Sequence, residues 1–278
     1  MMKNTLLFLT ISLLSTQMIA QSEEVSFFFG SSYYIGDLNS KHFDQNTNPA
    51  LGIMYKRNHR NDRYSFRLQF TYGKVEAYDI QSSDDWQRNR DLNFQSTLLE
   101  LGAIMEVNFN KYRVGQTEKL NKTPYLFFGI AGYNFKPKGL YNDSWYDLQA
   151  MGTEGQNTSA NPNDYYKLNQ LAIPVGIGFK KNINKNWAWS IEYGARILFT
   201  DFLDDVSGKY VDPQILANES GVLTPILADR SYNQVGNQNI GNDRGNPALK
   251  DWYFFAGFTL SYSFNKGDEC TNAFKRKD

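Results

Sequence analysis

The sequence predicts an all-β protein, an eight-stranded antiparallel up-and-down transmembrane β-barrel of the outer-membrane type with long extracellular loops. Three observations predict this fold. Apolar and polar residues alternate over segments long enough to cross a bilayer at a tilt, which takes roughly 9–11 residues. There are eight such segments, and the connections between them alternate in length. A secretory leader precedes the first segment.

The clearest segment is Trp187–Phe199, in which every odd position is apolar. The even positions include Ser190, Glu192, Gly194 and Arg196. Successive side chains of a strand point to opposite faces, so one face is apolar and the other is polar and charged. We expect the apolar face to contact lipid and the polar face to line a filled lumen.

The first four predicted strands show the same period of two residues. Their expected ranges are Val25–Tyr34, Ala50–Arg57, Tyr64–Gly73 and Phe94–Phe109. The third alternates cleanly along its whole length. Its apolar face carries Tyr64, Phe66, Leu68, Phe70 and Tyr72.

The last four predicted strands are Pro124–Phe135, Lys167–Lys180, Trp187–Phe199 and Trp252–Phe264. The fifth strand of the chain places four aromatic residues on one face, namely Tyr125, Phe127, Tyr133 and Phe135. Pro174 interrupts the sixth strand. Because proline cannot donate a ladder hydrogen bond, a β-bulge is expected there.

The connections support an up-and-down barrel. Short links are predicted at 58–63 and 181–186, and an intermediate one at 110–123. Long links are predicted at 35–49, 74–93, 136–166 and 200–251. Outer-membrane barrels have short periplasmic turns and long outer loops, so both termini are expected in the periplasm.

The leader and the composition agree with a cell outer membrane location in a Gram-negative organism. Residues 1–20 are predicted to be a signal peptide, residues 21–264 the barrel and residues 265–278 a periplasmic tail. The 29 basic and 29 acidic residues give no case for nucleic-acid binding. An aromatic content of 15% suits a lipid-facing wall, and outer-membrane lipids are expected partners. The mean hydropathy of −0.54 argues against a helical membrane protein.

Charged residues within the strands fall on the polar faces, namely Arg67, Glu100, Glu106, Glu192 and Arg196. A basic residue on the lipid face at mid-bilayer costs about 2–4 kcal/mol. We therefore expect these five to pair in a narrow lumen that has no open pore. The alternative is a soluble barrel of lipocalin type with apolar faces inward. Aromatic residues at the strand ends and the terminal Phe264 favour the membrane barrel.

The sequence gives little support for catalysis. Its two histidines, His42 and His59, form no cluster, and phosphate loops and nucleophile elbows are absent. Asp201, Asp204 and Asp205 suggest either a Ca²⁺ site or, as we expect, a solvated acidic turn. No cofactor or metal site is expected. A barrel enzyme or small-ligand-binding barrel that acts through its extracellular loops is the alternative function.

The long loops are richer in aromatic residues than disordered loops are. They are expected to fold over the barrel mouth, either packing on one another or forming a docking surface. Both interpretations stay open from the residues alone. The candidate docking residues are Trp145, Tyr146, Glu154, Asp204, Asp205 and Arg244.

The tail 265–278 contains Cys270, the single cysteine of the chain. One interpretation is a solvated tail with an idle thiol. The other is a periplasmic contact locked by an intermolecular disulfide, because that compartment is oxidising.

Several motifs resemble the PorG family, an outer-membrane component of the type IX secretion system of Bacteroidetes. The resemblance covers about 25–270 of the chain. It is carried by Ser32–Asn39 (SYYIGDLN), Trp145–Gln149 (WYDLQ), Gly152–Gln156 (GTEGQ), Thr200–Ser207 (TDFLDDVS), Arg244–Asn246 (RGN), Lys250–Phe254 (KDWYF) and Cys270.

The resemblance implies a non-enzymatic barrel that works with the periplasmic PorK–PorN ring in protein export and, in gliding relatives, motility. Cys270 is similar to the family's tail cysteine. It is therefore the candidate for a covalent link to the PorK lipoprotein.

Overall fold

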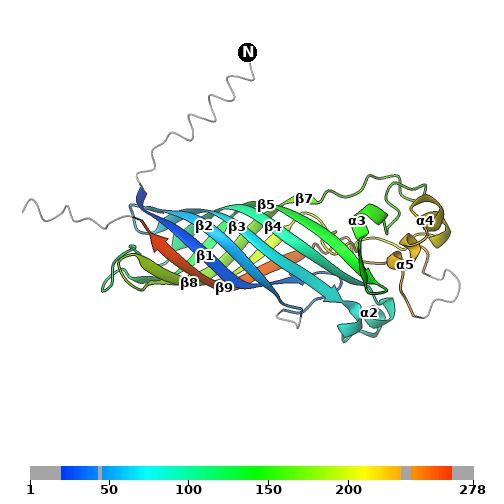
Figure 1. The fold of residues 1–278 in the computed structure, drawn as a ribbon, viewed down its shortest axis with the longest axis horizontal. Helices are drawn as coiled ribbons and strands as arrows, with labels where there is room; N and C mark the ends of the chain where they lie inside the picture. Colours follow the sequence, from blue (N-terminus) through cyan, green and yellow to red (C-terminus); the bar gives the residue numbers. More distant parts are fainter. Residues whose placement is uncertain (1–19, 43–45, 233–238, 265–278) are drawn as a thin grey trace, which may run out of the picture.

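The computed structural model describes residues 20–42, 46–232 and 239–264. Within them, eight long antiparallel strands form a closed barrel (Figure 1). Each strand pairs with the next, and the last pairs with the first along Glu24–Ile35. The predicted eight-stranded fold is thus confirmed. The strands are β1 (Ala20–Ile35), β2 (Asn48–His59), β3 (Tyr64–Tyr78), β4 (Asn93–Asn108), β5 (Lys122–Tyr141), β7 (Asn169–Asn182), β8 (Trp187–Leu198) and β9 (Trp252–Ser263).

The two faces of the wall differ sharply in chemistry. In β8, Trp187 and Ile191 are exposed on the outside, whereas Glu192 and Arg196 are buried inside. The other strands repeat this alternation, and the outward residues are mainly large and apolar. These include Phe27, Phe29, Leu51, Ile53, Phe66, Leu68, Phe70, Leu101, Leu126, Phe128, Ile130, Leu171, Ile177 and Phe258.

The four aromatic residues grouped on one face of β5 point into the lumen. Tyr125 and Phe127 are buried there, while Leu126 and Phe128 face outward. The reason lies in the neighbouring strands. Inward-facing glycines on β7 and β8 leave room that the Tyr125 and Phe127 rings occupy, and a Cβ at any of these glycines would lie within 2.6 Å of a ring atom. These glycines are Gly176, Gly178 and Gly194.

The bulge predicted at Pro174 is wrong. Pairing between β5 and β7 lapses for two pairs, opposite Gly129 and Ile130, but the register is the same on both sides of the lapse. On its other side, Pro174 pairs in register with Arg196. The sheet therefore tolerates the missing N–H donor by leaving a gap in one ladder, without an inserted residue.

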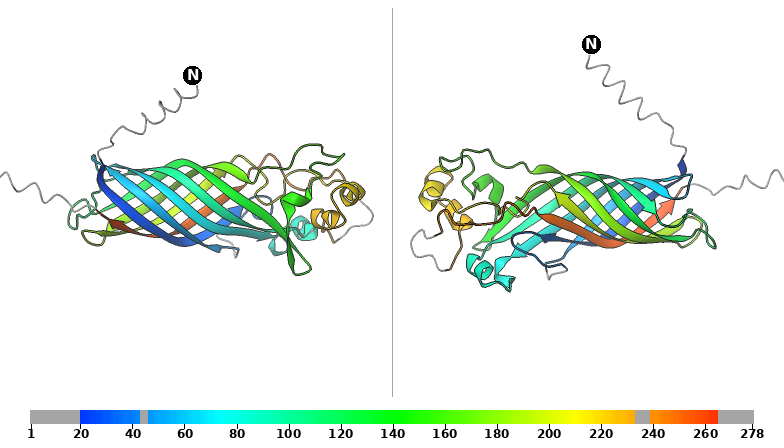
Figure 2. Two further views of the ribbon diagram at one scale, coloured as in Figure 1. Left: turned by 45° about the horizontal axis from the view of Figure 1, so that its top comes forward. Right: turned by 180° about the vertical axis from the view of Figure 1, so that it is seen from behind.

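Helices and a short hairpin gather at one end of the barrel, where the long connections lie (Figures 1 and 2). They are η1 (Asp79–Gln81), α2 (Asp85–Arg90), β6 (Ser144–Asp147), α3 (Leu148–Met151), α4 (Pro213–Glu219) and α5 (Thr224–Ala228). β5 runs six residues past its predicted end and pairs with β6. The start of β1 and the end of β9 lie at the opposite end (Figure 1).

No helix in the described parts of the chain is both long and apolar enough to cross a membrane. Residues 1–19 and 265–278, and with them most of the predicted leader, the tail and Cys270, lie outside the described residues.

Candidate functional site: a filled lumen beneath a folded cap

The short-turn half of the lumen is filled by a buried ion network. The Glu106 carboxylate forms ion pairs with three cations, and its oxygens lie 2.9 Å from the Lys56 nitrogen, 3.1 Å from an Arg67 nitrogen and 2.7 Å from the Lys180 nitrogen. Arg67 also binds both oxygens of Glu192, at 2.6 and 2.9 Å. These side chains are at most 8% exposed. Such bidentate, charge-assisted pairs are the strong class of ion pair.

A second pair lies further toward the long loops. Arg196 donates to both oxygens of Glu100, at 2.9 and 3.0 Å. Gln69 and Tyr253 each donate to the same carboxylate at 2.7 Å. The Arg196 guanidinium stacks 4.5 Å from the centroid of the Phe255 ring. All five charged residues predicted for the lumen therefore lie inside it and are paired.

Sequence reasoning missed three further members of the network, Glu24, Lys56 and Lys180. The alternation of the second and sixth strands would have found Lys56 and Lys180, because both share the inward face. With them the described lumen holds four cations and four carboxylates, so its net charge is zero. They are Lys56, Arg67, Lys180, Arg196, Glu24, Glu100, Glu106 and Glu192.

Among the described residues, the barrel interior shows no open pore. A cavity of about 10 Å³ beside Gln69 and Arg196 is at the lower limit for one water molecule. At the short-turn end, the hydroxyl of the buried Tyr112 donates to Asn182. The centroid of its ring lies 5.0 Å from the Lys180 ammonium nitrogen. Interior side chains therefore fill the barrel, as expected for eight strands.

The long connections fold into one unit, which we call the cap (described residues of 36–47, 79–92, 142–168 and 199–251). At its centre is Arg244, which is 1% exposed. Its guanidinium donates to the Ala228 carbonyl at 2.9 Å, to the Glu154 carboxylate at 3.0 Å and to the Asp205 carbonyl. Arg90 binds the Arg244 carbonyl at 2.6 Å.

The three aspartates at 201–205 do not form the solvated turn that we expected, because all three are buried. Asp205 accepts from Thr153 and from Tyr166 at 2.6 Å. Asp204 accepts from Tyr34 and from the Val206 amide. Hydroxyl and amide donors therefore take the place of water around Asp204 and Asp205, and these two aspartates connect the strand ends to the loops.

Four of the six candidate docking residues are buried, which corrects their proposed surface role. Glu154, Asp204, Asp205 and Arg244 hold the cap together and are at most 6% exposed. The other two lie on β6 and are half-buried. Tyr146 packs against the apolar core of the cap, and Trp145 pairs with Leu140 of β5.

Arg90 and Asp79, which the sequence did not single out, form a buried bidentate pair at 2.6 and 2.8 Å. No local signal marks them, because an arginine and an aspartate in a polar loop look like solvated residues.

The family described as Domain of unknown function (DUF6089) matches residues 3–218. The chain belongs to this family. No curated protein matches the sequence significantly.

Three solved structures illustrate the folds that this DUF6089 barrel is similar to. The N-terminal β-barrel domain of Pseudomonas aeruginosa OprF is 14% identical, with a TM-score of 0.37, and the match covers 88% of this chain and 98% of that one. A major outer membrane protein from Thermus thermophilus is 13% identical, with a TM-score of 0.41 and 87% and 99% covered. Neisserial surface protein A is 8% identical, with a TM-score of 0.40 and 87% and 97% covered.

The membrane assignment rests on the DUF6089 barrel's own outer wall. Each strand of the closed barrel pairs with a neighbour on both sides, which a membrane-spanning sheet requires. Its large apolar side chains face outward and its charges face inward. A soluble barrel has the reverse arrangement. The fold is therefore a closed eight-stranded barrel of the outer-membrane type.

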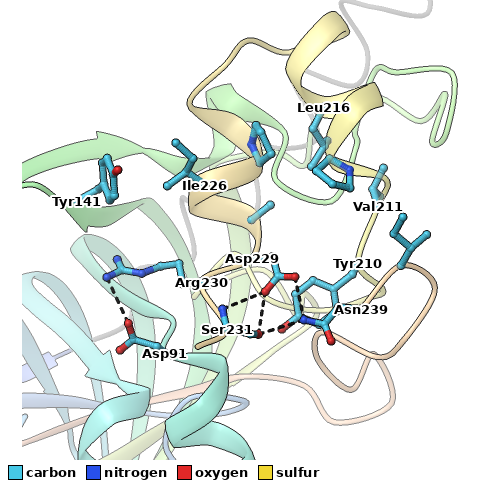
Figure 3. Close-up of a pocket in the computed structure, with 14 residues that line it drawn as sticks. Asp91, Tyr141, Tyr210, Val211, Leu216, Ile226, Asp229, Arg230, Ser231 and Asn239 are labelled. Atoms are coloured by element: carbon cyan, nitrogen blue, oxygen red, sulfur yellow. Dashed lines mark hydrogen bonds and ion pairs between the residues drawn. The ribbon is translucent and has the colours of Figure 1, made fainter. Parts of the chain in front are cut away.

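The cap of this DUF6089 protein also contains a half-open cavity of about 460 Å³ (Figure 3). It lies between the end of β5, α4 and α5. Tyr141, Leu216 and Ile226 supply apolar walls, and an ion pair between Arg230 and Asp91 at 3.5 Å lies at one side. The cavity is large enough for a small ligand or a partner's side chain.

Burial makes the cap sensitive to pH. It raises the pKa of Asp201 to about 7 and that of Asp205 to about 6, above an unfolded value of about 3.9. Between pH 4 and 7 the folded cap therefore binds more protons than the unfolded cap, so its stability falls as pH rises through this range. Each unit by which a pKa is raised corresponds to about a tenfold change in the ratio of folded to unfolded cap.

We therefore expect amide hydrogen exchange in residues 200–207 to be at least about tenfold slower at pH 5 than at pH 8. The measured exchange rates must first be corrected for the pH dependence of amide exchange in an unfolded chain. The double variant Asp201→Asn, Asp205→Asn is the control and should lose part of this dependence, because burial also raises the pKa of Asp204 and that of Asp251. Equal pH dependence in both proteins would contradict the assignment.

Proposed function

We propose that this protein is a non-enzymatic component of type IX protein secretion in the outer membrane, where it anchors or docks the periplasmic PorK–PorN ring. The observation that carries the proposal is the filled barrel. Its lumen is packed by neutralised ion pairs and covered at both ends. A barrel without an open channel acts through the molecules that bind at its two ends.

The described loop motifs that carry the resemblance to PorG support the proposal because they meet in the cap. Arg244 contacts Glu154, and Asp37 accepts from the Asn246 amide at 3.0 Å. Tyr34 contacts Asp204 and Asp251. Motifs up to 217 residues apart in sequence thus build one network. Motifs that contact one another in a single folded unit support the resemblance more strongly than motifs on separate loops would.

The proposed orientation places the short turns in the periplasm. Long loops face outward in barrels of this type, and both ends of the barrel chain are at the short-turn end. The tail 265–278 then starts in the compartment where the ring lies, and Cys270 is the proposed attachment point.

Replacing Cys270 with serine tests the covalent attachment. In intact envelopes on a non-reducing gel, the wild-type protein should run partly as a heavier band that dithiothreitol removes and that Cys270→Ser lacks. Because Cys270 is the only cysteine, the band cannot come from another thiol of this chain. Identical mobility of the two proteins would rule out the covalent version.

A second function is favoured by the 460 Å³ cavity in the cap. A small-ligand barrel or a barrel enzyme would act there. Clean deletion of the gene separates the two functions. Loss of secretion supports the export role, whereas intact secretion together with loss of a lipid or peptide activity supports the cavity role.

A further inference from the structure

The described part of the apolar outer wall contains an open groove of about 630 Å³ over β5. Its floor is Gly132, where an added Cβ would have no atom within 4 Å. Leu101 of β4 and Leu171 of β7 are the register partners of Gly132 on either side, and they are 64% and 65% exposed. Phe70 and Phe199 extend the two walls. A single glycine between large apolar residues thus makes a short slot that opens toward Asn134 and Asn169, and the outward Ile130, two residues below on the same strand, bounds its other end.

The groove changes from apolar to polar toward the cap. Two residues above Gly132, Asn134 donates to Asn169 at 2.8 Å across the β5–β7 seam. Two residues further, Lys136 shares a row with Thr97 and Lys74. At about 3.3 Å per residue, the Lys136 Cα lies roughly 13 Å from that of Gly132 along the strand. This is the order of distance between an acyl chain within the bilayer and a lipid headgroup.

The lysines above the groove form a basic cluster with exchangeable partners. Lys136 and Lys138 share Asp147, at 2.7 and 3.5 Å, and Lys74 pairs with Glu76 at 2.8 Å. Three ammonium groups thus face two carboxylates. The lysine side chains are 35–50% exposed. Solvent-exposed pairs of this kind are weak, so the ammonium groups can turn toward another anion.

We propose that this surface binds a phosphorylated glycolipid of the outer leaflet, with one acyl chain along the groove over Gly132 and a phosphate on Lys136 and Lys138. Glycine lets the chain approach the backbone closely. Ammonium-to-phosphate hydrogen bonds are charge-assisted and are stronger than neutral ones. The proposal rests on the orientation given under the proposed function, in which the cap is outermost.

The basic end of the site is tested by native mass spectrometry of the full-length barrel purified in non-ionic detergent. Three probes are added separately: bisphosphorylated lipid A, the same lipid after dephosphorylation, and phosphatidylglycerol. We expect the wild-type protein to bind the bisphosphorylated lipid about tenfold better than either other probe. The double variant Lys136→Gln, Lys138→Gln should lose most of that preference.

The matched control is Lys122→Gln, Lys181→Gln, which removes two exposed lysines that face each other at the short-turn ends of β5 and β7, away from the cap. It should bind like the wild-type protein. Equal binding of all three probes, or equal loss in the two double variants, would overturn the proposal. Neither result depends on Cys270 or on secretion, so failure here is separate from failure of the ring-anchoring role.

The groove is tested by Gly132→Leu, which fills the slot from the lipid side. Because the Cβ meets open space, the barrel should keep its heat-modifiable mobility on a gel, which reports folding. Binding of the bisphosphorylated lipid should fall several-fold. Unchanged binding in a folded Gly132→Leu barrel would also overturn the proposal.

Discussion

Replacing Arg67 with alanine is expected to destabilise the barrel by about 3–5 kcal/mol, the usual cost of removing one partner of a buried ion pair. Arg67 joins the Glu106 and Glu192 carboxylates and is 1% exposed. Without it, Glu192 keeps a hydrogen bond from Tyr125 at 2.6 Å but has no cation in contact among the described residues. The lumen would then hold one excess negative charge that water cannot reach.

The measurement is reversible urea unfolding of the barrel in lipid vesicles, followed by tryptophan fluorescence. The matched control is Arg57→Ala, which breaks an exposed pair with Glu23 at 2.8 Å near the short turns. That variant should unfold like the wild-type protein, because exposed pairs contribute little. A double variant, Arg67→Ala with Glu192→Gln, should recover part of the loss, since it restores charge balance.

If Arg67→Ala and Arg57→Ala shift the unfolding midpoint equally, the lumen network is not what stabilises the barrel. If the double variant is as unstable as the sum of its parts, Arg67 and Glu192 are not coupled. Either result would contradict the description of the lumen as a set of interdependent ion pairs.

Much of the barrel is predictable from sequence because the alternation that decides which side chains face lipid lies within single strands. Alternation along Trp187–Phe199 reports which side chains face lipid, and a charge such as Glu192 on the polar face is then fixed inside. Loop lengths report which connections lie together at one end. The sequence did not, however, indicate that Tyr125 and Phe127 point inward. That depends on glycines in β7 and β8, which are neighbours only after the barrel has closed.

The cap is not predictable in this way, because its contacts join residues far apart in the chain. Arg244 binds Glu154 across 90 residues, and Tyr34 binds Asp251 across 217. A charged residue in a long polar loop resembles a solvated one, so Asp204 and Asp205 suggested a surface turn. These motifs are unusual for polar loops, but composition cannot distinguish a residue on an exposed binding surface from a buried residue that supports the fold.

Replacing Arg244 with alanine is expected to open the cap while leaving the barrel closed. Arg244 is buried against Glu154 and Asp205 and donates to two backbone carbonyls. Loss of the guanidinium leaves Glu154 without its cation, at a local cost of about 3–5 kcal/mol. Each 1.36 kcal/mol corresponds to about a tenfold change, so exchange of cap amides should rise by roughly a hundredfold or more.

Hydrogen exchange read by mass spectrometry measures this effect separately in the cap and the strands. Residues 152–156, 203–208 and 227–230 should lose protection in Arg244→Ala, whereas β3 and β4 should not change. Lys209→Ala is the matched control, because Lys209 pairs with Asp243 at the exposed surface of the same cap. Unchanged protection in Arg244→Ala, or loss of protection in the strands as well, would refute the cap as a separate cooperative unit. If the cap opens as expected, secretion measured in the same variant tests whether the proposed export role requires the folded cap.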